Sequence, residues 1–143
     1  RYGNVYGPRQ DPFGEAGVVA IFTLKLLQNE QPIITGNGKQ TRDYLCVEDV
    51  VEANMAVLNG GLNGTFSVGT GREPSVNQLF RLLADTIGSP VKERYGPERR
   101  GEQLRSCIDA TKLSKASDWD ARVSLADGLK RTVDYFRQTM EPR

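Results

Sequence analysis

The sequence predicts an α/β fold, and two observations carry this prediction. Strand-like segments alternate along the chain with segments whose apolar residues recur every three or four positions, the spacing of one helix face. Capping and turn residues separate these segments. The composition is that of one globular domain with a buried core, because 38% of the 143 residues are hydrophobic and 26% are charged.

The first half of the chain is expected to contain two helices between short strands. Apolar residues at helical spacing run from Val18 to about residue 29, where Asn29 and Pro32 end the pattern. A second broad apolar face predicts a helix over 48–58. The expected strands of this half are 1–6, 32–35, 40–47 and 65–69, with a loop over 7–14 and a tight turn over 36–38.

The second half is expected to contain three helices, two of which are marked by capping residues. Ser75 and Gln78 predict a capping box ahead of a helix that Gly88 would end. Ser124 with Asp127 predicts the start of the last helix. The remaining expected elements are strands over 91–95 and 106–108 and a helix over 112–117.

The charge pattern argues against nucleic acid and membranes as partners. Nineteen Lys and Arg against eighteen Asp and Glu give a formal charge of +1, so no net field attracts polyanions. Acidic residues also interrupt the basic cluster from Arg94 to Arg105. No apolar stretch reaches the roughly 18 residues of a membrane span, and no signal-peptide pattern opens the chain, so we expect a cytoplasmic protein.

The absence of certain residue types limits the catalytic and metal-binding chemistry that the chain can perform. The chain has no histidine, which removes Ser-His and Cys-His nucleophile systems and the common metal sites. Cys46 and Cys107 lie in strand-like sequence without metal-ligand spacing, so we expect reduced, buried thiols and no metal. The glycine-rich segments 36–38 and 69–71 lack the spacing of a dinucleotide fingerprint, which favours plain turns over phosphate loops.

Two arginines are candidates for binding phosphate. Arg42 lies in an expected strand and Arg99 in a charged loop, so both could present planar guanidinium groups to a diphosphate. The alternative is a surface salt bridge to a neighbouring carboxylate, which spacing alone favours.

Four stretches have the order and spacing of one family. They are RYGNVYGPRQ at 1–10, GNGKQTRDY at 36–44 running into VEDV at 47–50, FSVGTG at 66–71, and RRGE at 99–102 with Asp109 and Lys112 behind it. From residue 1 to about 138 the chain resembles the extended short-chain dehydrogenases that act on nucleotide sugars, and most closely the UDP-glucose 4-epimerases. The resemblance implies that residues 1–143 form the nucleotide-sugar-binding C-terminal part of a Rossmann-type fold, without the cofactor domain. Segments of about 1–6 and 44–71 would pack on that missing NAD-binding domain.

The resemblance also implies roles for individual residues. Asn4, Arg42 and Arg99 would contact the diphosphate, and Glu102 would take the ribose hydroxyls. Tyr2 would lie near the nicotinamide, and a small residue at Ser106 would leave room for an N-acetyl group on the sugar. The residues expected to contact the base, mainly through their main chain, are Gly17, Val18, Ile33, Ile34 and Thr35.

The chain departs from the family pattern in three ways. Gly3 replaces an aromatic residue, and Arg100 replaces a proline that would stiffen its loop. The glycine-rich NAD loop and the YxxxK pair, whose tyrosine is the base, would lie before Arg1. The resemblance therefore implies NAD-dependent epimerisation through a 4-keto sugar in the complete enzyme. It implies no catalytic residue in this chain, and no NAD or activity for the chain alone.

Several alternatives remain at this level. The chain could be a stand-alone, non-catalytic nucleotide-binding or interaction module, or half of a nucleotide-sugar 4,6-dehydratase or decarboxylase. The expected partners are a UDP-sugar, the NAD-binding domain, and a second copy in a homodimer or exchanged dimer. Self-association is expected because a strand edge at Phe66–Val68 and an apolar helix face would be exposed.

Overall fold

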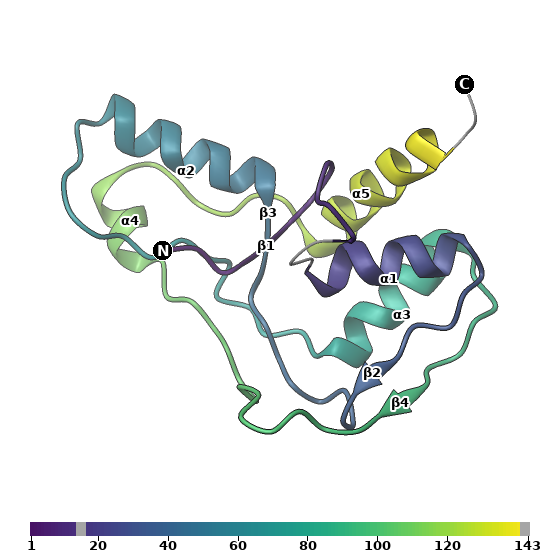
Figure 1. The fold of residues 1–143 in the computed structure, drawn as a ribbon. Helices are drawn as coiled ribbons and strands as arrows, with labels where there is room; N and C mark the ends of the chain where they lie inside the picture. The colour runs from purple at the N-terminus through teal and green to yellow at the C-terminus, as the bar shows by residue number, and fades with distance from the viewer. Residues whose placement is uncertain (14–16, 141–143) are drawn as a thin grey trace.

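The computed structural model describes residues 1–13 and 17–140, and its helices and short strands confirm the α/β class (Figure 1). The predicted loop over 7–14 ends at Gly14, which lies outside the described residues. The elements in chain order are β1 (Asn4–Tyr6), α1 (Val18–Leu27), β2 (Ile34–Thr35), β3 (Tyr44–Cys46), α2 (Val47–Asn59), α3 (Val76–Ile87), β4 (Tyr95–Gly96), α4 (Thr111–Ala116) and α5 (Leu125–Met140).

Figure 1 shows two groups of helices joined by the strands: α1, α3 and α5 pack together at one end, and α2 and α4 lie at the other. The strands form two parallel pairs. β1 pairs with β3 so that Asn4 lies opposite Tyr44, and β2 pairs with β4 so that Ile34 lies opposite Tyr95. These pairings bring together segments that are far apart in sequence.

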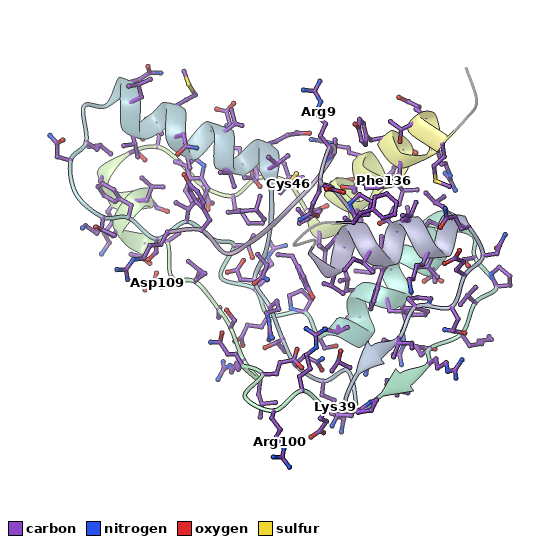
Figure 2. All side chains as sticks on the ribbon, viewed as in Figure 1. Arg9, Lys39, Cys46, Arg100, Asp109 and Phe136 are labelled. Carbon is purple, nitrogen blue, oxygen red and sulfur yellow. The ribbon has the colours of Figure 1, made fainter. Side chains whose placement is uncertain are left out.

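The strand β3 separates two apolar cores. Its alternating side chains point to opposite sides, so Tyr44 and Cys46 belong to one core and Leu45 to the other. The larger core fills the space between α1, α3 and α5, where Phe22 and Phe80 meet edge to face at 5.9 Å. Figure 2 labels Cys46 at the end of β3, where α2 begins, and Phe136 on α5. The smaller core lies under α2 and α4 and contains Leu45, Val50, Ala53, Val68, Leu113 and Trp119.

The predicted helix caps are confirmed. The Ser75 and Gln78 side chains form a reciprocal capping box, and Gly88 ends α3 in the left-handed conformation with φ of 75°. At the start of α5, the Asp127 N–H donates to Ser124 Oγ at 3.1 Å.

The strand predictions were too long. The expected strand over 65–69 is reduced to one bridge between Val68 and Tyr2, and the segment 106–108 is not a strand. Strand 40–47 shortens to β3, because Thr41 bridges to Ser75 instead of continuing the ladder. These segments lack a continuous partner strand within the described residues, so the ladder hydrogen bonds that define a strand do not form.

Both cysteines are free, as expected, but only one is buried. Cys46 is 1% exposed, whereas Cys107 is exposed, because its segment is not part of a sheet that would cover it. Among the described residues, no group of three or more acidic, Cys or His side chains is placed to hold a metal ion. No described helix has both the length and the apolar character needed to cross a membrane.

Candidate functional site

Eight of the residues predicted to bind substrate line one cavity of about 470 Å³. These residues come from segments spread over the chain and are Asn4, Gly17, Val18, Ile33, Thr35, Arg42, Arg99 and Glu102. The cavity lies beside the start of α1, the strand β2 and the loop that follows β4.

The strand pairings explain why these residues meet. The parallel pair of β2 and β4 places the loop of Arg99 and Glu102 beside Ile33 and Thr35. The pair of β1 and β3 places Asn4 next to the RDY segment, where the Asn4 N–H donates to the Asp43 carbonyl at 2.7 Å.

Three predicted residues lie elsewhere. Ile34 is fully buried in the larger core, and its N–H donates to the Arg94 carbonyl at 2.8 Å. Tyr2 is 49% exposed, and its hydroxyl donates to Asn54 Oδ1 at 2.8 Å. Ser106 is half-buried and is not among the residues that line the cavity. The roles predicted for these residues stay predictions.

Sequence reasoning missed five residues of the cavity wall, namely Ile21, Phe22, Gln40, Tyr44 and Val76. Ile21 follows Val18 by three residues on the same helix face, a spacing that could have identified it. Tyr44 completes the RDY motif. Gln40 is buried, and its side-chain Nε2 donates to the Thr35 carbonyl at 2.9 Å, which fixes the strand beside it.

Arg42 connects the cavity to the loop that closes it. One guanidinium nitrogen, Nη1, donates to the main-chain carbonyls of Thr41 at 2.8 Å and Gln103 at 2.6 Å. The other, Nη2, forms an ion pair with Glu102 Oε1 at 3.3 Å, and the Arg42 side chain is only 17% exposed. The salt bridge that the sequence offered as an alternative for Arg42 is therefore present. It lies within the cavity wall, and Glu102 is 60 positions from Arg42 in the sequence.

The other two arginines of this region differ from Arg42. Arg99 is exposed, and within the described residues its guanidinium has no hydrogen-bond or ion-pair partner. Arg100 projects away from the body of the molecule at the tip of the same loop (Figure 2). Arg99 is thus an available cation in the cavity wall, whereas Arg100 does not line the cavity.

Tyr44 lines the cavity from β3, and its hydroxyl has no hydrogen-bond partner although it is buried. Burial raises the pKa of Tyr44 to about 12, and the nearby Arg42 opposes this increase. The hydroxyl is therefore neutral at pH 7 and remains a possible donor.

Asp43 fixes the chain between these two residues. Its carboxylate is fully buried and accepts hydrogen bonds from Thr70 N, Thr70 Oγ1, Gly71 N and Ile108 N at 2.8–3.1 Å. The main chain at Gly69 lies so close to Ile108 that a Cβ added at Gly69 would be 2.4 Å from Ile108 Cβ. Because Asp43 takes the N–H groups of this glycine-rich turn, the turn does not serve as a phosphate loop.

The family model described as GDP-mannose 4,6 dehydratase matches residues 1–132 of the chain. The chain belongs to this family. Its similarity to solved members is high: the chain is 51% identical to a UDP-glucose 4-epimerase from Thermotoga maritima, determined with UDP-glucose, with a TM-score of 0.94. That match covers 99% of this chain and 46% of the epimerase.

Two curated relatives are a second epimerase and a decarboxylase. The chain is 46% identical to a UDP-glucose 4-epimerase of Mycolicibacterium smegmatis, over 94% of this chain and 43% of that protein. It is 32% identical to UDP-glucuronic acid decarboxylase 1 of Xenopus tropicalis, over 96% of this chain and 32% of that protein. The chain thus spans less than half the length of these relatives, and its α/β fold corresponds to part of an epimerase and dehydratase fold of the Rossmann type.

Proposed function

We propose that the chain forms the nucleotide-sugar-binding part of an NAD-dependent UDP-sugar 4-epimerase. The observation that carries the proposal is the 470 Å³ cavity, in which residues from five separate segments meet. A cavity that combines apolar side chains with a few converging charged groups is typical of a small-molecule binding site.

In the proposed complex, the two ends of the cavity bind different parts of the ligand. Arg42, Arg99 and Asn4 bind the diphosphate, for which Arg42 offers a planar guanidinium held in a low-exposure site. Glu102 accepts from the ribose hydroxyls. The base lies against Val18 and the main chain of Ile33 and Thr35, beside the apolar side chains of Phe22 and Val76.

In this proposal the present chain binds the substrate, and a second domain, which holds NAD, carries out the reaction. NAD, when bound there, accepts and returns the hydride at C4 of the sugar. Placing NAD in the other domain is supported by the 69–71 turn, whose Thr70 and Gly71 N–H groups donate to Asp43 and are not free to hold a phosphate. This chain instead anchors the nucleotide firmly, so that the sugar can turn between the two hydride transfers without loss of the substrate.

We further propose that segments 1–6 and 44–71 pack on this NAD-binding domain. Val68 hydrogen-bonds to Arg1 and Gly3 on one edge of the first segment, whereas the main chain of Tyr2 has no partner within the described residues. On this second edge β3 pairs from Asn4 onward, so the further strand of the NAD-binding domain would pair at Tyr2, ahead of β3. Close to Tyr2, the helix α2 exposes Val51 and Leu58, which are 53% and 73% exposed.

Binding of UDP to the chain tests the proposal. Calorimetry should detect UDP binding, and Arg99→Gln should weaken it about tenfold through loss of a charge-assisted hydrogen bond. The matched control is Arg100→Gln, which removes the same charge at a side chain that points away from the cavity. No binding at millimolar UDP, or equal effects of the two substitutions, would contradict the proposal.

The decarboxylase relative supports a second candidate activity for the complete enzyme. Assays of a protein in which this chain is joined to an NAD-binding domain of the family distinguish the epimerase from the decarboxylase activity. Interconversion of UDP-glucose and UDP-galactose indicates an epimerase, whereas release of CO₂ from UDP-glucuronic acid indicates a decarboxylase.

A further inference from the structure

Tyr44 carries a buried hydroxyl that the folded chain leaves without a hydrogen-bond partner. The residue is 4% exposed, and no described residue exchanges a hydrogen bond with the hydroxyl oxygen. A buried hydroxyl in this state costs free energy, and native proteins rarely leave one unpaired. This hydroxyl is therefore suited to form its hydrogen bond with a ligand.

Arg42 shows to which cavity this hydroxyl belongs. Arg42 and Tyr44 are two positions apart and both line the nucleotide cavity, whereas the carboxylate of Asp43 between them is directed to the 69–71 turn. Tyr44 also borders a second cavity, of about 490 Å³, but Arg42 does not line that one. The charge of Arg42 is close enough to the hydroxyl to oppose the rise in the pKa of Tyr44 that burial causes. The hydroxyl therefore lies on the side of the nucleotide cavity.

The polar side chains around this hydroxyl are mainly donors. Arg42 and Arg99 contribute guanidinium groups to the same wall, and Arg99 has no ion-pair partner within the described residues. Among the residues described in this wall, Glu102 is the one acid, and it already accepts from Arg42 at 3.3 Å. Several donors thus converge where acceptors are few, an arrangement that suits a ligand with many acceptor oxygens.

The charges of the wall give a neutral donor a further use. Arg42 and Arg99 contribute two positive charges and Glu102 one negative charge, which leaves a net charge of +1. A nucleotide diphosphate carries negative charge on both of its phosphate groups, so its charge exceeds that of the wall. Hydrogen bonds from neutral groups stabilise such excess charge. The Tyr44 hydroxyl is a buried, neutral group of this kind.

We propose that the Tyr44 hydroxyl donates a hydrogen bond to a phosphate oxygen of the bound nucleotide and thereby favours ligands that carry a diphosphate. This inference rests on the proposed function, because it assigns a contact within the same cavity. The hydroxyl keeps its proton and acts through the hydrogen bond alone. Tyr44 is thus a specificity-determining residue, whose contribution separates the affinity for UDP from the affinity for uridine.

Tyr44→Phe removes only the hydroxyl and tests this contact. Calorimetry of the chain should show a Kd for UDP that is raised about tenfold, and an unchanged Kd for uridine, which has no phosphates. In urea unfolding without ligand, Tyr44→Phe should not lower the free energy of unfolding, because the folded chain loses no hydrogen bond. The matched control is Tyr135→Phe, which removes a hydroxyl from α5 outside the cavity wall and should leave both affinities unchanged.

The outcomes separate a failure of this contact from a failure of the proposed function. If the unsubstituted chain binds UDP and Tyr44→Phe binds it equally well, the Tyr44 contact is refuted while the nucleotide site stands. Equal losses for UDP and uridine would also overturn the contact, since they would place the hydroxyl away from the phosphates. A larger loss of unfolding free energy in Tyr44→Phe than in Tyr135→Phe would overturn it as well, because the hydroxyl would then serve the fold. Absence of UDP binding by the unsubstituted chain would remove the nucleotide site and this contact together.

Discussion

The single residue that does most in the proposed site is Arg42, because it holds the loop over 99–103 and also faces the cavity. The sequence left two alternative roles for Arg42, a salt bridge and a contact with phosphate. In the structure the two are compatible, since the guanidinium has donors enough for two main-chain carbonyls, Glu102 and a ligand.

Arg42→Ala is expected to weaken UDP binding by about 1.5–3 kcal/mol in an enzyme that carries the NAD-binding domain, or about ten- to a hundredfold. Uridine lacks the phosphates and should lose much less affinity. The two affinities are measured by calorimetry. Glu102→Gln is the control, because it removes the ion pair but keeps the Arg42 charge, and it should weaken the binding of UDP and of uridine by similar factors, since both contain the ribose. Equal losses for UDP and uridine in Arg42→Ala would mean that Arg42 only supports the loop.

Asp43→Asn should lower the free energy of unfolding by about 2–3 kcal/mol, because an amide group cannot accept from all the donors that the buried carboxylate satisfies. Urea unfolding followed by circular dichroism measures the change. Asp85→Asn removes an exposed carboxylate from α3 and should have almost no effect. A loss at Asp43 no larger than the loss at Asp85 would rule out the proposed anchoring role.

Ser106→Tyr tests the prediction that a small side chain admits an N-acetyl group. Ser106 is half-buried and lies in a segment that is not a strand. In an enzyme with its NAD-binding domain, kcat/KM should fall for UDP-GlcNAc and stay similar for UDP-glucose. Cys107→Tyr adds the same bulk at an exposed neighbouring position and should leave the ratio unchanged. An unchanged ratio in both variants would remove Ser106 from the sugar pocket.

At the scale of elements, the helices could be predicted and the strands only in part. A helix closes its hydrogen bonds within one segment, so apolar spacing and caps such as Ser75 with Gln78 are sufficient signals. A strand depends on a partner elsewhere in the chain, which explains why 91–95 becomes the two-residue β4 and 106–108 pairs with nothing in the described chain. The cavity residues Phe22 and Tyr44 were missed for the same reason, because three-dimensional packing brings them to the wall.

The helix α2 is expected to mediate self-association of the chain. Val51, Met55 and Leu58 are 53%, 45% and 73% exposed on this one helix. Sedimentation analysis at micromolar concentration should show a dimer, and Leu58→Gln should shift the chain toward the monomer. Leu104→Gln is the control, because Leu104 is 77% exposed but lies in a loop. A monomer at these concentrations would argue against both a homodimer and an exchanged dimer.

At the scale of the whole molecule, a polypeptide of residues 1–143 is expected neither to retain NAD nor to convert UDP-glucose. The reason is that the described residues offer no dinucleotide loop, and the proposed role of this chain is confined to binding the substrate. Absorbance of the purified polypeptide and a coupled assay for UDP-galactose provide the measurements. Addition of the NAD-binding domain is the positive control. NAD that copurifies with residues 1–143 would disprove the prediction.

The short strand β3 also has a consequence for how the molecule unfolds. Because Tyr44 and Cys46 lie in one core and Leu45 in the other, neither core can open without disturbing the same three residues. The two helix groups should therefore behave as one cooperative unit, in which amide protons near β3 exchange with solvent only when the entire chain opens. A destabilising change under α4 would then loosen the distant nucleotide cavity as well, so loss of ligand affinity in such a variant need not imply any contact with the ligand.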